Sequence, residues 1–144
     1  MLVKDFMHPN IFHIGSQATL LEVAEKLLAN RVDTLLVLEG EELLGVIGIR
    51  DLFTAPIPAH YGNSMLKHDN EMQLLRIWKT IQVQNLMNDK VLSVDEDTTL
   101  LRAIELMVNS GKHPLPVVRD GKVVGIISRM DIVRALVTEN NGRI

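Results

Sequence analysis

The sequence predicts an α+β fold built from two copies of one β-α-β-β-α unit. The first observation is an internal repeat, in which the copies align without a gap at a constant offset of 80 positions. The matching pairs include Gly45 with Gly125, and Asp51 with Asp131. The second observation is the hydrophobic pattern, since each copy has a helical stripe followed by two apolar, β-branched runs. Two copies are too few for a solenoid, so we expect them to pack face to face about a pseudo-twofold axis.

The repeat also predicts the domain boundaries. Residues 1–53 form the first repeat, residues 54–82 form a connection, and residues 83–144 form the second repeat. Each repeat alone would bury little apolar surface, whereas a chain of 144 residues with 47% hydrophobic content can fill one shared core. We therefore expect the two repeats to fold together.

The first repeat is predicted element by element from its local signals. Its segments are an extended piece at 11–14, a helix at 19–30, strands at 34–38 and 43–49, and the start of a second helix at 51–53. Thr19 followed three residues later by Glu22 is typical of a capping box, which begins the first helix. The two strands are separated by a short segment that contains Gly40, which indicates a hairpin.

The connection interrupts the symmetry of the two repeats. Residues 54–70 contain prolines and a glycine and have no sustained period, which indicates a loop. This loop is our candidate for carrying a response to a ligand. Residues 72–81 predict a helix whose apolar side includes Trp78, which we interpret as a packing anchor.

The second repeat follows the same plan. Its segments are an extended piece at 91–94, a helix that starts near residue 99, strands at 115–118 and 123–127, and a closing helix from Asp131 to Val137. Gly111 is predicted to end the first of these helices. The pair Asp120-Gly121 is a strong signal for a two-residue hairpin turn.

Composition narrows the function. The chain has no cysteine, a formal charge of −3 and no uninterrupted apolar run that could span a membrane. We therefore expect a cytoplasmic protein without a membrane or nucleic-acid partner. No nucleophile–base set or phosphate-loop motif is present, so we expect no enzymatic activity. The histidines show no metal-ligand spacing, and all except His113 are interpreted as surface or loop residues, so no metal site is predicted.

Polar groups gather where the last strand meets the closing helix, at Ile127-Ser128-Arg129-Met130-Asp131. Backbone N–H groups at a helix start favour phosphate, and an Asp can accept hydrogen bonds from sugar hydroxyls. This pattern indicates a nucleotide pocket. The alternative is that Ser128 or Asp131 only caps the helix. The repetition of the junction at Asp51 favours the pocket, and we expect Asp131 to serve a ribose rather than the core.

The doubled pattern resembles a pair of cystathionine-β-synthase (CBS) domains. The resemblance is carried by the stretch Leu115-Pro116-Val117-Val118-Arg119-Asp120-Gly121-Lys122-Val123-Val124-Gly125-Ile126-Ile127-Ser128-Arg129-Met130-Asp131, which is very similar to the family signature. It covers nearly the whole chain except the connection, and it implies a free-standing pair of tandem repeats. The family also implies a flat homodimer that forms through the helices of the pair.

The resemblance implies two clefts for an adenosine nucleotide, each built from both repeats. The first cleft combines Phe12, Val32, Asp33, Ile127, Ser128, Arg129 and Asp131. In it the apolar residues would hold the adenine, Asp131 would bind the ribose, Ser128 would contact sugar or phosphate, and Arg129 would supply positive charge.

The second cleft combines Ile47, Gly48, Asp51, Leu92, Lys112 and His113. Gly48 stands where the family has Ser or Thr, which removes one hydroxyl contact. On the other hand, Asp33 would face the phosphate side of the first cleft, whereas Lys112 and His113 surround the second. We favour the first cleft because its motif is intact.

Two functions from different classes remain open. One is a regulatory sensor that binds AMP, ADP, ATP or an S-adenosyl compound between the repeats, with no further cofactor. The other is a ligand-free interaction or dimerisation module with vestigial clefts and an unidentified protein partner. Ser128 and Asp131 favour the sensor, whereas Gly48 and the long connection leave room for the interaction module.

Overall fold

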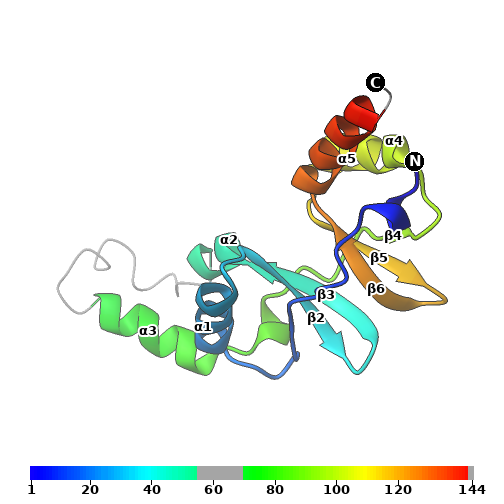
Figure 1. Ribbon diagram of the computed structural model, residues 1–144. Coiled ribbons are helices and arrows are strands. Elements are labelled where there is room, and N and C mark those ends of the chain that lie inside the picture. Colours follow the sequence, from blue (N-terminus) through cyan, green and yellow to red (C-terminus); the bar gives the residue numbers. More distant parts are fainter. Residues whose placement is uncertain (55–69, 143–144) are drawn as a thin grey trace. The chain divides into compact units, whose positions relative to one another are not determined.

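The computed structural model describes residues 1–54 and 70–142 of the chain. Residues 55–69 lie outside the described residues, so the predicted loop at 54–70 and its proposed response are not part of this description. In chain order the described elements are η1 (Val3–Asp5), β1 (His13–Ile14), α1 (Leu20–Asn30), β2 (Thr34–Glu39), β3 (Glu42–Gly48), α2 (Ile49–Phe53), α3 (Asn70–Thr80), η3 (Val83–Asn85), β4 (Val94–Asp95), α4 (Leu100–Ser110), β5 (Leu115–Arg119), β6 (Lys122–Ile127) and α5 (Arg129–Gly142). The α+β class and the β-α-β-β-α order of both repeats are confirmed (Figure 1).

The chain divides into two compact units, which we name after their helices. The α4–α5 unit contains Met1–Ile11, Gly40–Leu43 and Val91–Ile144, and the α1–α2 unit contains Phe12–Glu39 and Leu44–Lys90. Each unit has its own buried apolar cluster, and the clusters include Leu115 and Ile127 in the α4–α5 unit, and Leu35 and Ile47 in the α1–α2 unit. Each repeat therefore contributes most of one core.

The α1–α2 unit holds a three-stranded sheet in the order β1-β2-β3, with β1 parallel to β2. The hydroxyl oxygen of Thr19 accepts a hydrogen bond from the Glu22 backbone N–H at 3.2 Å, which confirms the predicted start of α1. Helix α3 packs beside α1 (Figure 1), and the indole N–H of Trp78 donates to the Leu52 carbonyl at 3.3 Å. Trp78 is thus the packing anchor that the sequence predicts.

The α4–α5 unit repeats this plan with the strand order β4-β5-β6, where β4 is parallel and β6 antiparallel to β5. Gly111 ends α4 with a φ of 70°, a left-handed value that glycine adopts without steric cost. Asp120 and Gly121 have φ values of 51° and 77°, which confirms the predicted two-residue turn between β5 and β6.

The closing helices begin two residues earlier than the sequence predicts. Helix α2 starts at Ile49 rather than Asp51, and α5 starts at Arg129 rather than Asp131. The reason is that each Asp lies in the first turn and bonds back to the backbone N–H of the residue that directly precedes its helix. Position 49, predicted as the end of a strand, therefore belongs to a helix.

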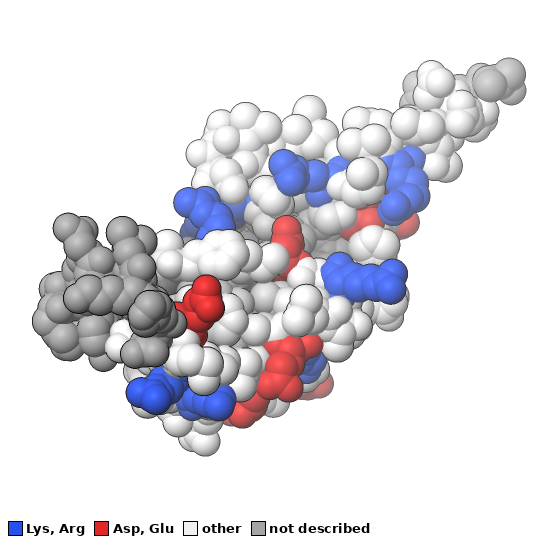
Figure 2. Space-filling view, turned by 90° about the vertical axis from the view of Figure 1, so that its left-hand side faces the viewer, with Lys and Arg blue, Asp and Glu red and all other residues white. Residues whose placement is uncertain are grey.

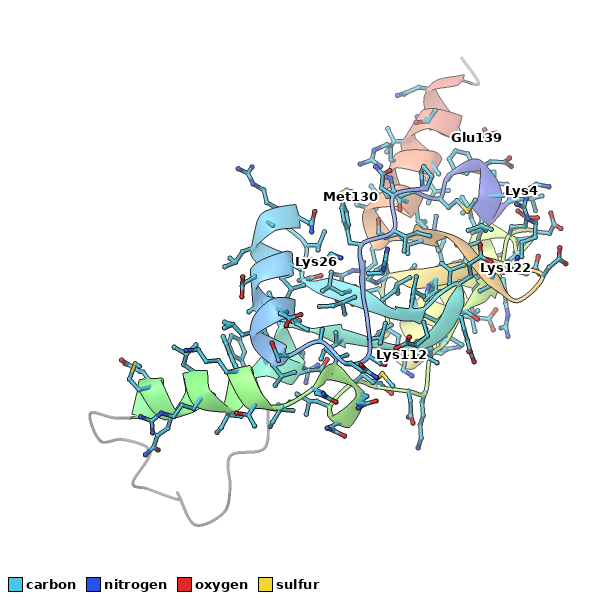
Figure 3. All side chains as sticks on the ribbon, turned by 90° about the horizontal axis from the view of Figure 1, so that it is seen from below. Lys4, Lys26, Lys112, Lys122, Met130 and Glu139 are labelled. Atoms are coloured by element: carbon cyan, nitrogen blue, oxygen red, sulfur yellow. The ribbon has the colours of Figure 1, made fainter. Side chains whose placement is uncertain are left out.

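Each repeat begins with a short stretch that we call its leading segment, residues 1–11 in the first repeat and residues 83–90 in the second. Each leading segment packs in the compact unit that holds the helices of the other repeat. In the α4–α5 unit the backbone N–H of Val3 donates to Thr98 O at 2.8 Å, and His8 and Ile126 exchange backbone hydrogen bonds of 2.8 and 3.0 Å. Lys4, labelled in Figure 3, contacts the Asp97 carboxylate at 2.9 Å. The hydrogen bond to Asp97 raises the pKa of Lys4 above its ordinary value.

The matching segment after α3 behaves in the same way in the α1–α2 unit. The Val83 backbone N–H donates to Ala18 O at 2.8 Å, and Asn88 and Val46 exchange backbone hydrogen bonds of 2.9 and 3.0 Å. The compact units therefore do not coincide with the sequence repeats, because each one includes a short segment from the repeat that it does not represent.

Close backbone contact at these exchanged segments requires glycine in the facing strand. A Cβ atom at Gly125 would lie 2.7 Å from the His8 carbonyl oxygen and 2.8 Å from the Met7 sulfur. Gly45 faces Asn88 and Met87 at 2.8 and 2.9 Å in the same manner. Glycine at both matching positions therefore allows each leading segment to pack directly against the backbone of the facing strand.

This contact predicts that Gly125→Ala lowers the free energy of unfolding by about 1–3 kcal/mol, because either the strand or the leading segment must shift to admit the methyl group. The measurement is urea unfolding followed by circular dichroism. Gly15→Ala is the matched control, since a Cβ atom at that position would have no neighbour within 4 Å. Equal stabilities of the two variants would contradict the prediction.

Candidate functional site

The junction between β6 and α5 is closed by a reciprocal pair of hydrogen bonds. The Ser128 backbone N–H donates to Asp131 Oδ2 at 2.8 Å, and the Asp131 backbone N–H donates to Ser128 Oγ at 3.1 Å. Two backbone N–H groups at the helix start that have no partner inside the helix are satisfied in this way. The capping role that the sequence offered as the alternative is therefore present.

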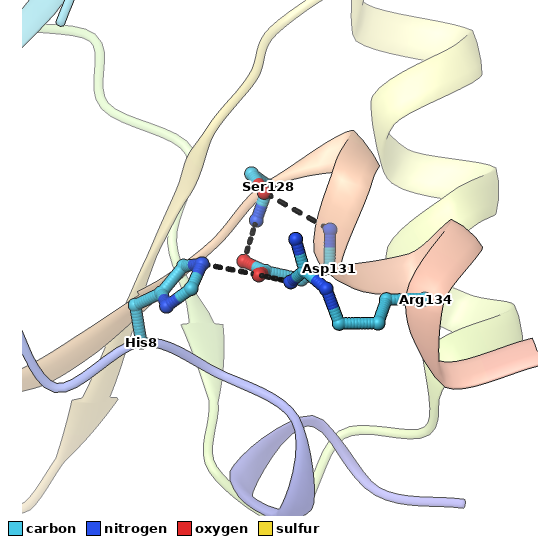
Figure 4. A network of polar contacts seen from close by, with 4 residues as sticks. All are labelled: His8, Ser128, Asp131 and Arg134. Carbon is cyan, nitrogen blue, oxygen red and sulfur yellow. Dashed lines mark hydrogen bonds and ion pairs between the residues drawn. The ribbon is translucent and has the colours of Figure 1, made fainter. Parts of the chain in front are cut away.

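The carboxylate of Asp131 is also held by two basic side chains. His8 Nε2 contacts Asp131 Oδ1, and Arg134 Nη1 contacts the same oxygen at 3.2 Å. Figure 4 shows the two basic groups reaching the carboxylate from opposite sides. The Asp131 side chain is 0% exposed, whereas those of His8 and Arg134 are 49% and 61% exposed. Burial of the carboxylate is offset by these contacts and by its backbone hydrogen bond.

These contacts bear on two expectations. The carboxylate of Asp131 caps α5 and contacts two basic groups, so it contributes to the core, and its role toward a ribose stays a prediction. His8 is exposed, as the sequence predicts, and its ring also contacts the fully buried carboxylate. The signal that could have found His8 is a difference between the repeats, since Asn88 stands at the matching position.

The matching junction in the α1–α2 unit is more open. Asp51 Oδ2 accepts a hydrogen bond from the Gly48 backbone N–H at 2.8 Å, as in the other repeat. Asp51 is only half-buried, and within residues 1–54 and 70–142 no hydrogen bond or ion pair reaches its Oδ1. Thr54 takes the place of Arg134 and donates instead to the Arg50 carbonyl at 3.0 Å.

The missing hydroxyl at Gly48 has a local packing cause. A Cβ atom at this position would lie 2.7 Å from the carbonyl oxygen of Asp33, which accepts a hydrogen bond from the Ile49 N–H at 3.0 Å. A serine side chain cannot fit there unless the Asp33 backbone moves. The close approach of the Asp33 carbonyl to Gly48 therefore explains why this position has no side-chain hydroxyl.

The remaining predicted site residues fall into two groups. Ile47 and Ile127 are 0% exposed and belong to the cores of their units. Partly or largely accessible residues are Phe12, Val32, Asp33, Leu92, Lys112, His113 and Arg129. The structure thus gives Ile47 and Ile127 a packing role, and it leaves the second group accessible.

The structure brings predicted residues together within each unit. Phe12, Val32, Asp33, Ile47, Gly48 and Asp51 belong to the α1–α2 unit, and Leu92, Lys112, His113, Ile127, Ser128, Arg129 and Asp131 belong to the α4–α5 unit. Each predicted cleft draws on both sets. The pairing of residues across the two sets stays a prediction.

The α4–α5 unit contains an apolar cavity of about 440 Å³ on its helical side. Its walls are Ile104, Met107, Val108, Gly111, His113, Arg129 and Ile132. His113 and Arg129, which the sequence assigns to different clefts, therefore line one cavity. They are the two basic residues of a largely apolar surface to which α4 and α5 contribute.

Charge and metal-ligand patterns add little to this site. On the face drawn in Figure 2, lysines and arginines are interspersed with acidic and uncharged residues and do not form one basic surface. Across residues 1–54 and 70–142 no group of three or more His, Asp or Glu side chains is arranged to hold a metal ion. Within the same ranges no helix has the length and apolar content needed to cross a membrane.

The repeated fold and its capped strand–helix junctions define the class of this protein. The family model of the CBS domain matches residues 3–57 and 83–138, and the chain belongs to the CBS domain family. The predicted family, its tandem repeats and its fold are thereby confirmed. The chain is a CBS pair, which is a regulatory type of module.

Curated relatives resemble the chain over most of its length. An uncharacterised protein of Methanopyrus kandleri is 29% identical over 118 residues, which is 81% of this chain and 53% of that protein. The chain thus spans about half the length of this relative. A CBS domain-containing protein of Dictyostelium discoideum is 27% identical over 139 residues, which is 95% of this chain and 92% of that protein.

Solved structures show the same pair fold. The CBS-pair protein CBSX2 from Arabidopsis thaliana is 29% identical with a TM-score of 0.80, over 97% of this chain and 96% of that chain. A structure of CBSX2 in complex with AMP is 31% identical with a TM-score of 0.76, over 96% and 98% of the two chains.

The two junctions predict unequal costs of losing their carboxylates. We expect Asp131→Ala to lower the free energy of unfolding by about 2 kcal/mol, because a buried cap and the contacts with His8 and Arg134 are lost, and Asp51→Ala to lower it by about 1 kcal/mol. Urea unfolding of both variants gives the comparison, and each variant is the control for the other. A larger loss for Asp51→Ala would show that the network around Asp131 does not stabilise the fold.

Proposed function

We propose that this CBS pair is a regulatory module that binds an adenosine-containing nucleotide, namely AMP, ADP, ATP or an S-adenosyl compound. The observation that carries the proposal is the likeness to CBSX2 over nearly the full length of both chains, since CBSX2 has been solved in complex with AMP. The module acts without catalysis of its own, and the nucleotide is its ligand rather than a cofactor. Binding regulates by favouring the conformation that has the higher affinity for the nucleotide.

The carboxylate of Asp51 is the group best suited to a ribose in the free protein. Its Oδ2 is engaged by the Gly48 N–H, and its Oδ1 has no partner among the residues that the structure describes. A carboxylate oxygen accepts hydrogen bonds from hydroxyl groups, and a vicinal diol supplies two donors. This reverses the preference for the first cleft, which rested on the intact Ser128 motif alone.

The other groups of the Asp51 site follow from the family resemblance. Lys112 and His113 would supply positive charge to the phosphate, and Leu92 would contact the adenine side, whereas Ile47 is fully buried and supports the site from the core. Lys112 is partly exposed and His113 is exposed. The site around Asp131, with Phe12, Val32, Asp33 and Arg129, is proposed as the second nucleotide site.

This proposal predicts that AMP binds the purified protein and that Asp51→Asn weakens the binding at least about tenfold, because an amide replaces one acceptor oxygen with a donor. Isothermal titration calorimetry with AMP measures the effect. Asp120→Asn is the control, because it makes the same chemical change at an exposed hairpin turn. Unchanged affinity in Asp51→Asn would remove Asp51 from the site, and no heat with AMP, ATP or S-adenosylmethionine would remove the proposed function.

A second candidate function, dimerisation without a ligand, is favoured by an exposed apolar face on α5. Its residues are Met130, Val133, Leu136 and Val137, which are between 49% and 62% exposed. The same helix turns Ile132 and Ala135 into the core of its own unit. We propose that a second copy of the chain covers the exposed face in an isologous homodimer, which is compatible with nucleotide binding.

The dimer predicts that the protein has twice the monomer mass in light scattering at micromolar concentration, and that Val133→Glu shifts it to a monomer, because a charge would be buried in the apolar interface. Thr138→Glu is the control on the same helix, since Thr138 is exposed and is not part of the apolar face. A wild-type monomer would contradict the dimer without affecting the proposed nucleotide site.

A further inference from the structure

We propose that His8 controls access to the Asp131 carboxylate. Its imidazole occupies the position that a ribose hydroxyl would need, so a nucleotide binds at Asp131 only after the side chain of His8 turns away. The inference rests on the proposed nucleotide function and adds a specific gating residue to it. The two repeats then differ in function, with an open site at Asp51 and a closed site at Asp131.

The acceptor capacity of Asp131 supports this assignment. A carboxylate offers about four lone-pair positions. At Asp131 one is used by the Ser128 N–H, one by Arg134 and one by His8. A ribose diol needs two, so one of the three present partners must leave. The side chain has no exposed surface on which a ligand could bind without displacing a neighbour.

His8 is the partner that can leave with the least change in the fold. The Ser128 N–H is part of the cap of α5 and cannot move without opening the helix start. Arg134 belongs to α5 itself, one turn beyond Asp131, and approaches from the other side (Figure 4). His8 instead belongs to the leading segment Met1–Ile11, which is separate from the helix start that Asp131 caps.

Only the side chain of His8 needs to move. Its backbone is fixed by the two hydrogen bonds with Ile126, and Gly125 leaves no space for the segment to approach more closely. The side chain is 49% exposed, so solvent is available on its free side. Rotation about the side-chain bonds therefore frees one acceptor position on Asp131 Oδ1, which Arg134 still contacts, while the leading segment stays in place.

The α1–α2 unit lacks this contact although the matching backbone hydrogen bonds are present. Asn88 takes the place of His8 and makes the matching backbone hydrogen bonds with Val46. Its side-chain oxygen accepts from the Lys90 N–H at 3.0 Å, and it makes no contact with Asp51 among those that the structure describes. The chain thus offers a natural exchange of residues with which to test the role of His8.

The test measures AMP affinity by calorimetry in pairs of variants. Asp51→Asn removes the open site, so that binding in this background reports on Asp131. We expect His8→Asn in the Asp51→Asn background to raise AMP affinity about tenfold, the change that corresponds to removing one competing hydrogen bond to a charged group. His13→Asn in the same background is the control, since His13 is exposed and makes no ion pair within the described ranges.

The reciprocal change gives an independent measurement. Asn88→His in the otherwise unchanged protein should lower AMP affinity at Asp51 about tenfold, because it places a ring beside the open carboxylate. Thermal unfolding of all variants shows whether they fold. Equal AMP affinity with and without His8, while the wild type binds AMP through Asp51, overturns the gating role and leaves the proposed function intact. Absence of binding of AMP, ATP and S-adenosylmethionine in every folded variant overturns both.

Discussion

Each repeat depends on one hydrogen bond between a carboxylate in the first turn of its closing helix and the backbone N–H at the end of the preceding strand. The bond measures 2.8 Å in both repeats, from Gly48 to Asp51 and from Ser128 to Asp131. It fixes where the helix begins and satisfies a backbone donor that the helix itself leaves open. Under the proposed function the same carboxylate would also bind a ribose, so folding and binding would draw on the same oxygen atoms.

The conflict between these two uses is resolved differently in the two repeats. In the first repeat the cap uses one oxygen of Asp51 and leaves the other without a described partner. In the second repeat, His8 and Arg134 both contact the remaining oxygen of Asp131, and the side chain is fully buried. A duplicated unit therefore has one carboxylate with both oxygens engaged, at Asp131, and one that keeps an oxygen without a described partner, at Asp51, although the sequence motif is more complete around Asp131.

The exchanged leading segments make this difference possible. Residues 1–11 form backbone hydrogen bonds with β6 in the α4–α5 unit, and residues 83–90 form the matching bonds with β3 in the α1–α2 unit. His8 can reach Asp131 only because its backbone is paired with Ile126. Gly45 and Gly125 permit the close approach, since a side chain at either position would meet backbone and sulfur atoms at less than 3.0 Å.

The sequence by itself determined the repeat, the α+β class, the order of the elements and the turns at Gly111 and Asp120-Gly121, because these follow from local periodicity and backbone preference along the chain. It also identified both junction carboxylates. Only the tertiary structure decided that Asp131 is buried beneath His8 and that a close contact with Asp33 excludes a side chain at Gly48. These features arise from segments far apart in sequence, and no local pattern records which side chain will occupy the free oxygen of a carboxylate.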